Sequence, residues 1–352
     1  MSEQMNENRA FFRDTVERIL ADTLDKSHID AAENGELPDA LYGALVENGI
    51  TLMLVPEDQG GIGASLGDAA VILRAAGEAA APGPLLETML GQALLASAGL
   101  EPADGLVTLA FVDGLAVPDV GATSWANAAV HDVPWAGKVG KVLVVARAAG
   151  NAARLVVSDA AAWTVATRPD AAGEPRDSIS GAAVPVIVAE IGDYDHWLRS
   201  AAILRGAQIL GAIDWSFRRS VEYAGERKQF GREIGKFQAI QQMLAELAGH
   251  VLAASGIVEA AAEGATPALV AAARSRLGDA GDAAITICHQ VHGAMGFSLE
   301  YALNSRTRRI MAWRNDFGSV PYWRRTLAGG FAGLSREGFW PAVADAGLQQ
   351  VA

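Results

Sequence analysis

The sequence predicts a mainly α-helical protein with a small β domain between two helical regions. Apolar residues recur every three to four positions toward both ends of the 352-residue chain, whereas short β-type runs separated by Gly, Pro, Asp and Asn fill its middle. Alanine, the strongest helix former, is abundant. These patterns predict an N-terminal helical domain over residues 1–104, a middle β domain over 105–190 and a C-terminal four-helix bundle over 191–352.

The N-terminal region carries several amphipathic patterns. The expected helical faces are made by Phe11, Val16, Ile19 and Leu20, and by Leu41, Leu45 and Val46, with further helices over 66–80 and 85–98. The apolar run 50–55, which Pro56 ends, predicts a short extended segment. The glycines that follow lack the spacing and the strand-then-helix setting of a dinucleotide-binding fingerprint, so they predict a loop only.

The residue pattern of the middle region is typical of a small β structure. Its apolar runs are short and are bounded by turn-forming residues, which is typical of strands in an antiparallel barrel or sandwich. The expected strands cover residues 106–112, 141–146, 154–158 and 184–188.

The C-terminal region is strongly helical from about Asp193. Two successive helical faces are made by Ile203, Ala207, Leu210, Phe217 and Val221, and by Ile240, Met243, Leu244, Leu247 and Val251. Thr266 and Pro267 predict the start of a third helix, with threonine as the N-cap and proline in the first turn. Long helices with short connections predict a four-helix bundle.

Composition excludes several classes of function. Hydrophobic residues make up 51% of the chain and the net charge is −13. This acidic balance argues against nucleic acid and against an anionic membrane surface, because both require a cationic surface. No uncharged, uninterrupted apolar run reaches the roughly 18 residues that span a bilayer, and the polar start of the chain is unlike a signal peptide. The single cysteine, Cys288, excludes an intrachain disulfide. We therefore expect a cytoplasmic protein.

The most informative segment is the turn between the first two long helices, residues 226–241. It combines aromatic side chains with two glycines and four cations, namely Gly231, Gly235, Arg227, Lys228, Arg232 and Lys236. Glycine lets another group come close to the backbone, and the cations favour a negatively charged ligand. A charged turn of a helical hairpin that binds nothing is the alternative interpretation.

The run R-K-Q-F-G-x-x-I-G-K-F-Q-A-I-Q in this turn resembles the signature of the acyl-CoA dehydrogenases. The loop after Pro56 and the order of helical, β and bundle regions are similar to that family as well, so the resemblance covers nearly the whole chain. It implies FAD as the cofactor. It also implies that Arg227 and Phe230 contact the pyrophosphate and adenine of FAD in a neighbouring subunit, with Gln238 nearby. Arginine suits this role because its planar fork binds phosphate oxygens in pairs.

A second segment, residues 290–297, resembles the Q-x-x-G-G-x-G motif of the same family. The resemblance implies that Gln290 donates a hydrogen bond to the same pyrophosphate, and that Gly293 and Gly296 let the backbone approach it from another chain. Ala294 departs from the glycine that the family often has there. A plain helix C-cap is the alternative interpretation of the two glycines.

Two histidines in this part of the chain raise the question of a metal. His289 and His292 are three residues apart, so they share one face of a helix and could act as ligands together. No third ligand stands nearby at a useful spacing. We therefore expect no metal site.

The catalytic base is expected late in the bundle. The resemblance implies that a carboxylate removes the proton alpha to the thioester carbonyl, usually a glutamate in a Tyr-Glu-Gly run roughly two dozen residues after the glycine motif. Here that position holds Phe317, so Asp316, one residue earlier, is the candidate base. As alternatives, Asp316 caps a helix or pairs with Arg308 or Arg309. The chain then lacks the base, because residues 200–202, where a minority of the family has its glutamate, hold no acid.

The middle region departs from the family. Residues 109–113 stand where the family has the T-E-P-x-A-G-S-D run that hydrogen-bonds the flavin. Residues 142–145 replace the Trp-Ile-Thr strand that covers the flavin ring. Short, diverged members of this kind often form one half of a heteromeric dehydrogenase for bulky acyl groups such as steroid side chains.

The resemblance implies FAD-dependent α,β-dehydrogenation of an acyl-CoA thioester to the 2-enoyl-CoA, with electrons passed to an electron-transfer flavoprotein. One alternative is a non-catalytic subunit that supplies half of an FAD site to a heteromeric acyl-CoA dehydrogenase. Another is a flavin oxidase or monooxygenase of the same fold. Because the two motifs are expected to serve opposite subunits, we expect a homo-oligomer or a pairing with a second acyl-CoA dehydrogenase-like subunit.

Overall fold

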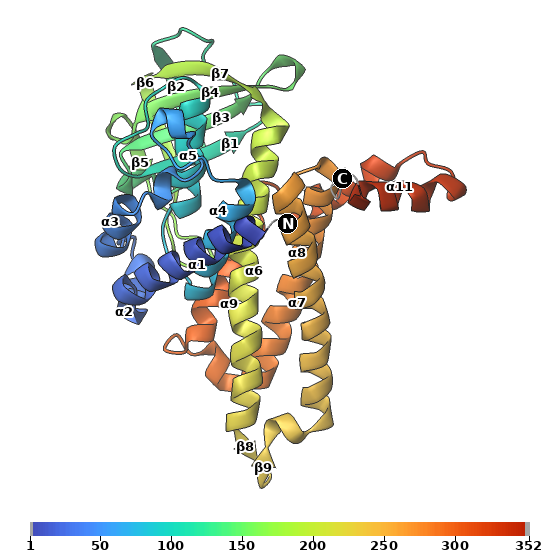
Figure 1. Ribbon diagram of the computed structural model, residues 1–352. Helices are drawn as coiled ribbons and strands as arrows, with labels where there is room; N and C mark the ends of the chain where they lie inside the picture. Colours follow the sequence, from blue (N-terminus) through green and yellow to red (C-terminus); the bar gives the residue numbers. More distant parts are fainter. Residues whose placement is uncertain (1–2, 349–352) are drawn as a thin grey trace. The chain divides into compact units, whose positions relative to one another are not determined.

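The computed structural model describes the backbone of residues 3–348 and the side chains of residues 7–344. Helices come first, strands follow and helices end the chain (Figure 1), so the predicted class is confirmed. The first helices are α1 (Glu3–Thr23), α2 (Lys26–Ala32), α3 (Asp39–Glu47), α4 (Leu66–Ala79) and α5 (Leu85–Ser97). The residues group into two compact units, one with residues up to 69 and 81–201, the other with 70–80 and the residues from 202 onward. The domain boundaries expected from the sequence stay predictions.

The prediction of an extended segment after α3 was wrong. Ile50–Leu52 form a 3-10 helix, and a further turn follows them. Gly49 enters this helix in the left-handed conformation, with φ of 71°, and Ile50, Met53 and Val55 are all buried. A short apolar run that is buried on every side shows the same pattern in a strand and in a tight turn, so periodicity does not separate the two.

Buried polar side chains join helix α5 to the start of the β region. The Thr88 hydroxyl donates to the Val107 carbonyl at 3.0 Å. The Gln92 side chain donates to the Ala103 carbonyl and accepts from the Ala103 amide, both at 2.8 Å. These bonds satisfy backbone groups that would otherwise be buried without a partner. They therefore fix where the first strand begins.

The strands of the β region form two sheets. The first has the order β1 (Val107–Val112), β3 (Lys141–Arg147), β4 (Ala152–Asp159) and β7 (Ile187–Asp193), and the second has β2 (Ser124–Pro134), β6 (Arg176–Pro185) and β5 (Thr164–Ala166). The expectation of a purely antiparallel structure was wrong at one edge, because β1 pairs with β3 in parallel. The chain crosses to the second sheet through β2 before it returns, and such a crossover is what parallel neighbours require.

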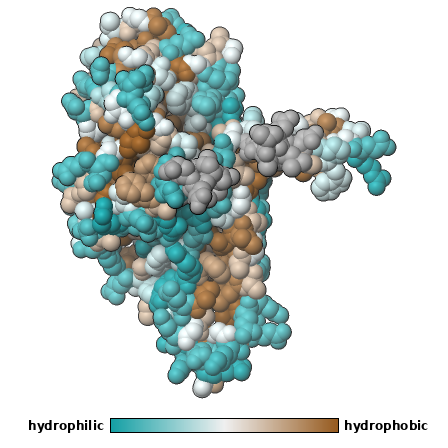
Figure 2. Space-filling model, in the orientation of Figure 1, coloured by the Kyte–Doolittle hydropathy of each residue, from teal (hydrophilic) through white to brown (hydrophobic). Residues whose placement is uncertain are grey.

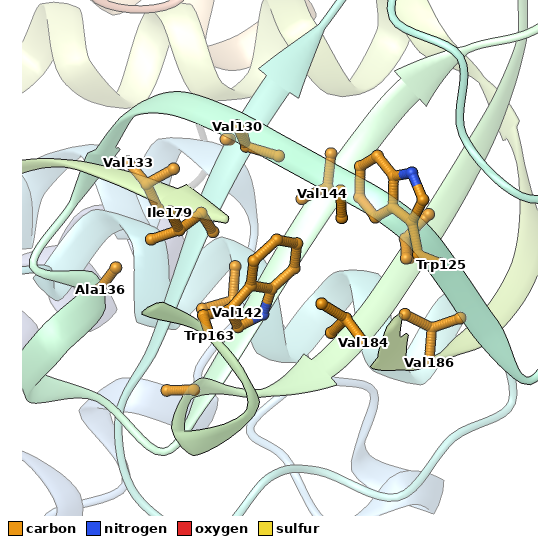
Figure 3. Packing of buried hydrophobic residues seen from close by; sticks show 14 of the residues in the cluster. Trp125, Val130, Val133, Ala136, Val142, Val144, Trp163, Ile179, Val184 and Val186 are labelled. Carbon is orange, nitrogen blue, oxygen red and sulfur yellow. The ribbon is translucent and has the colours of Figure 1, made fainter. Parts of the chain in front are cut away.

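Apolar side chains from both sheets fill the core of the β region (Figure 3). Trp125 and Trp163 meet edge to face, with their ring centroids 5.9 Å apart. The Trp163 indole donates to the Ser158 hydroxyl at 2.8 Å. Valines such as Val142 and Val184 pack around the two rings. The region thus has a core of its own.

Strand β2 was not predicted, for a physical reason. Asn127 and Asp132 adopt left-handed backbone, with φ of 48° and 58°, and the pairing with β6 shifts register between Val130 and Val133. Irregularities of this kind break the alternation of polar and apolar residues by which a strand is recognised.

The C-terminal bundle is built on three long helices. They are α6 (Tyr194–Glu226), α7 (Gln238–Gly264) and α8 (Pro267–His292), and α9 (Ala302–Trp313), α10 (Val320–Phe331) and α11 (Arg336–Leu348) follow. The predicted start of the third helix is confirmed, because the Thr266 hydroxyl accepts from the Leu269 amide at 3.3 Å.

Part of α4 belongs to the same compact unit as the bundle, and glycine makes this packing possible. A Cβ atom at Gly77 would lie 2.0 Å from the Gln208 carbonyl oxygen, and one at Gly211 would lie 1.9 Å from the Arg74 carbonyl oxygen. Only glycine fits at such a crossing. The Arg74 side chain then pairs with Asp214 of α6 at 2.7 Å.

Helix α7 is apolar yet largely uncovered within the chain. Only 17% of its most apolar stretch is buried. Leu252 is 75% exposed, and Gly249 and Gly256 have open space where a side chain would stand. Apolar side chains also show at the surface of the bundle in Figure 2. By length and composition alone α7 could cross a membrane, but it carries Glu246 and Glu259 and packs against α8.

Candidate functional site

The segment after α6 folds as a short hairpin. Strand β8 (Lys228–Gln229) pairs with β9 (Arg232–Glu233), and Phe230 and Gly231 make the turn between them. The Ile234 amide donates to the Arg227 carbonyl at 2.8 Å and closes the base of the hairpin. A 3-10 turn then leads into α7, whose first residue is Gln238.

Phe230 combines an unfavourable backbone with an exposed ring. Its φ is 50°, and 93% of the residue is exposed. A left-handed conformation costs a residue with a Cβ atom roughly 1–2 kcal/mol. Burial offsets little of that cost, because the ring is in solvent. The hairpin accounts for this backbone, because a two-residue hairpin turn favours positive φ at both central residues, here Phe230 and Gly231. The exposed ring is the feature that points to a ligand.

The cations of the hairpin differ in their contacts. Lys236 pairs with Glu233 at 2.9 Å, and the Arg232 guanidinium lies 4.2 Å from the centroid of the Phe237 ring. The exposed Arg227 side chain makes no hydrogen bond or ion pair with another residue that the structure describes. A guanidinium in this situation remains available to bind a pair of phosphate oxygens.

The glycines of the two motifs divide into open and packed positions. Gly231 and Gly293 have positive φ, and no atom lies within 4 Å of where a Cβ would stand. A Cβ at Gly235 would come within 3.0 Å of the last turns of α6, and one at Gly296 within 3.1 Å of His289. The first pair therefore leaves room for a ligand, and the second pair lets the chain pack closely.

Helix α8 ends at the second motif. Gly293 is its C-cap, and the Gly293 amide donates to the His289 carbonyl. The alternative interpretation of this glycine as a helix C-cap is therefore confirmed as a structural fact. It is compatible with a binding role, because Gln290 is exposed beside it and Phe297, after the glycines, is 67% exposed.

An aromatic stack joins the two motifs within one chain. Tyr223 is on α6, one helical turn before Arg227. Its ring lies nearly flat against that of His292, with ring centroids 4.3 Å apart and 25° between the ring planes. His292 directly precedes Gly293. The stack therefore connects the two motifs within one chain. That the motifs serve opposite subunits stays a prediction.

The open residues fit the adenosine diphosphate half of FAD. Arg227 can bind phosphate oxygens, the open backbone at Gly231 and Gly293 allows close approach, and Phe230 offers a flat ring to adenine. The individual cofactor assignments stay predictions for Arg227, Phe230, Gln238, Gln290, Gly293 and Gly296.

The loop that carries the candidate base Asp316 has its charged side chain paired within the chain. Asp316 Oδ2 lies 3.1 Å from Arg205 Nε, and the two side chains are 10% and 3% exposed. This partner comes from α6, whereas the sequence suggested Arg308 or Arg309. A carboxylate held by a buried guanidinium already has a structural partner within the chain. The assignment of Asp316 as the base stays a prediction.

The side chain of Arg274 on α8 binds backbone carbonyls of the same loop. Its Nη2 donates to the carbonyls of Arg314, Asp316 and Gly318 at 3.1, 2.8 and 3.3 Å. Arg274 is 2% exposed, and this burial lowers the pKa of its guanidinium to about 10, so it stays charged at neutral pH. The arginine satisfies carbonyls that follow the end of α9. Phe317, at the position expected for the base, is left-handed with φ of 53°.

Sequence reasoning missed Arg205 and Arg274. The available signal was a charged residue in an otherwise apolar helical pattern, as at Arg205 between Leu204 and Gly206. Such a residue predicts a buried charge that needs partners. The pattern does not say which loop supplies them.

The two histidines each use one ring nitrogen within the chain. His289 Nε2 lies 2.9 Å from the Thr307 hydroxyl, and His292 Nδ1 lies 2.8 Å from the Cys288 carbonyl. Among the residues that the structure describes, no group of three or more His, Cys, Asp or Glu could hold a metal ion.

Comparisons with known proteins agree with this architecture. The chain matches the family model for the acyl-CoA dehydrogenase N-terminal domain over residues 6–102, and that for the acyl-CoA dehydrogenase C-terminal domain over residues 196–328. Acyl-CoA dehydrogenase IpdE2 of Mycobacterium tuberculosis is 28% identical over 310 residues, which cover 86% of this chain and 91% of that protein.

Solved structures share the fold. The ChsE4–ChsE5 complex from Mycobacterium tuberculosis matches with a TM-score of 0.82 at 20% identity, over 95% of this chain and 99% of that chain. A variant of the Tcur3481–Tcur3483 steroid ACAD matches with a TM-score of 0.79 at 21% identity, over 92% and 97%. The fold is therefore that of the acyl-CoA dehydrogenases. With both domain models matched, the chain belongs to the acyl-CoA dehydrogenase family, whose members are oxidoreductases that act on acyl-CoA and bind FAD.

Proposed function

We propose that the chain takes part in the FAD-dependent α,β-dehydrogenation of an acyl-CoA thioester to the 2-enoyl-CoA, with electrons passed to an electron-transfer flavoprotein. The observation that carries the proposal is the open Arg227 turn, which has the charge and the free backbone that a diphosphate requires and which the Tyr223–His292 ring contact connects to the residue before Gly293. FAD, when bound, supplies the hydride acceptor for the β carbon. The chain holds the diphosphate through Arg227 and leaves room for it at Gly231 and Gly293.

The acyl group is proposed to be bulky, such as a steroid side chain. The support is the likeness to the Tcur3481–Tcur3483 steroid ACAD. The diverged stretch 109–113 of the β region also differs from the usual flavin-contacting run. Purified protein can be offered a short-chain acyl-CoA and a steroid-chain acyl-CoA in parallel. Faster flavin reduction by the short chain would contradict a preference for bulky groups.

We further propose that the chain works as an oligomer, either with itself or with a second acyl-CoA dehydrogenase-like subunit. The uncovered apolar face of α7, with Leu252 75% exposed, is typical of a subunit interface. The likeness to the ChsE4–ChsE5 complex supports the heteromeric form. In sedimentation, a monomer that still binds FAD tightly would contradict the proposal.

A second candidate function is favoured by the Asp316 ion pair. If Arg205 keeps Asp316 engaged, the chain supplies part of an FAD site while another subunit supplies the base. Absorbance spectra separate the two functions. A chain that is yellow when purified alone and bleaches with an acyl-CoA in the absence of oxygen is a complete dehydrogenase. A chain that bleaches only after co-expression with a second subunit is the site-sharing partner.

A further inference from the structure

The stack that joins the two cofactor motifs is more extensive than one ring pair. The His292 ring contacts both Tyr223 and Tyr301, with ring centroids 4.3 and 5.2 Å apart, and the two tyrosine rings also meet edge to face at 6.4 Å. Arg219 Nε donates to the Tyr301 hydroxyl at 2.9 Å, and the Arg219 guanidinium also binds the Glu226 carboxylate at 2.9 Å. The residues before the Arg227 turn are therefore connected to the residues around Gly293 by rings and hydrogen bonds.

The orientation of the His292 ring is fixed. Its Nδ1 lies 2.8 Å from the Cys288 carbonyl, which can only accept, so the ring proton is on Nδ1. His292 is 3% exposed, and burial lowers the pKa of its imidazole, so the ring is neutral at neutral pH. A neutral ring held on one edge by α8 and against one face by Tyr223 cannot rotate freely.

We propose that Tyr223 and His292 are positioning residues for the cofactor, which set the Gly293 turn in register with the Arg227 turn so that both can hold one diphosphate, in place of the expectation that the two motifs serve opposite subunits. Neither residue has to touch the cofactor for this role. The inference rests on the proposed binding of FAD. Its physical basis is that Tyr223 precedes Arg227 by one helical turn and that His292 immediately precedes the open glycine.

Tyr223→Leu tests the coupling, because it removes the flat ring and keeps an apolar side chain. We expect faster amide hydrogen exchange across residues 293–297 in the protein without FAD, although the substitution is on another helix. We also expect FAD to bind roughly three- to tenfold more weakly, the range for one lost aromatic contact. Tyr223→Phe keeps the ring and should match the wild type in both measurements.

Tyr322→Leu is the matched control. Tyr322 packs edge to face on Trp323 of α10, with centroids 4.9 Å apart, so the same substitution removes an aromatic contact in the same bundle. We expect it to lower the melting temperature without faster exchange at 293–297 and without weaker FAD binding.

The outcomes separate this inference from the proposed function. Wild-type protein that takes up no FAD, alone or with a second subunit, would overturn the proposed function. Unchanged exchange at 293–297 in Tyr223→Leu would overturn the positioning role even if FAD binds. Weaker FAD binding in Tyr322→Leu to the same extent would overturn it as well, because the effect would then follow stability alone.

Discussion

The hairpin around Arg227 and the loop around Asp316 belong to the same bundle, but they treat charge in opposite ways. The Arg227 side chain is exposed and has no ion-pair partner among the described residues. Asp316 is nearly buried and is held by Arg205, while Arg274 fixes the loop carbonyls. A charge left open in the free chain is available for a ligand, whereas a charge paired inside already has a structural role.

The contrast explains why the two regions differ in how readily they suggest a function. The hairpin leaves the aromatic ring of Phe230 in solvent, where a ligand can cover it. In the loop around Asp316, the carboxylate and the backbone carbonyls have partners within the protein. The comparison therefore supports a cofactor role for the hairpin more strongly than it supports a catalytic role for Asp316.

The largest expected effect concerns Asp316→Asn. If Asp316 is the base, the amide cannot take the alpha proton, so the rate of flavin bleaching by acyl-CoA should fall by about 10²–10⁴-fold while the FAD content is unchanged. Asp282→Asn is the matched control, because Asp282 pairs with Arg314 at an exposed position. Normal bleaching together with a lower urea midpoint would show that Asp316 is a structural residue and not the base.

The same substitution at two arginines, Arg274→Met and Arg227→Met, compares the loop around Asp316 with the hairpin around Arg227. Arg274→Met removes a buried charge and leaves the carbonyls of the 314–318 loop unmet, so the free energy of unfolding should fall by about 3–5 kcal/mol. Arg227→Met should change it little, because that side chain is exposed. Urea denaturation of both variants checks this. Similar losses for the two would show that the hairpin is also structurally engaged.

Arg227→Ala tests the open region for its ligand. Lost charge-assisted hydrogen bonds to phosphate should weaken FAD binding by about ten- to a hundredfold and leave the fold intact. Flavin content after dialysis and circular dichroism measure the two properties. Arg232→Ala is the comparison variant, because Arg232 is already engaged with Phe237. Full retention of flavin in Arg227→Ala would make Arg227 a turn residue only.

Phe230→Asn should separate strain from binding. Asparagine tolerates the left-handed backbone better than phenylalanine, so the free energy of unfolding should rise by up to about 1 kcal/mol. FAD binding should weaken because the ring is gone. Phe230→Leu keeps the strain and loses the ring, so it should weaken binding without a gain in stability. If Phe230→Asn keeps wild-type affinity, the ring does not contact the cofactor.

The smallest expected effect is the response to pH. Burial lowers the pKa values of His289 and His292 from the ordinary 6.5. As pH falls below 6.5, the unfolded chain takes up protons first, so the stability that the neutral rings contribute is complete above that pH and is lost as pH falls through their lowered pKa values. Arg274, with a pKa of about 10, keeps its charge over this range.

Urea midpoints measured on either side of pH 6.5 check the sign. The variant His292→Phe keeps an aromatic ring and removes one titrating group, so its stability should depend less on pH. An unchanged dependence in this variant would mean that other groups carry it.

The sequence was sufficient where structure follows from local pattern. The cap at Thr266 and the helices 66–80 and 85–98 were predicted close to where they lie, because each depends on residues near in the chain. The family resemblance added the fold, and the family matches confirm it.

The sequence was insufficient where partners are distant in the chain. The Arg205–Asp316 pair joins residues more than a hundred positions apart, and no periodicity encodes such a pairing. Strand β2 was missed because two left-handed residues interrupt its alternation. The segment after Gly49 was misassigned because burial on every side removes the difference between a strand and a turn.

The glycine crossing of α4 and α6 has a consequence for biosynthesis. The Arg74–Asp214 contact beside it joins residues 140 positions apart, and all the strands of the β region are translated between them. Helix α4 leaves the ribosome long before α6, against which it packs at Gly77. The growing chain therefore carries α4 without this close packing until α6 follows, and this interval is when it most needs protection from aggregation.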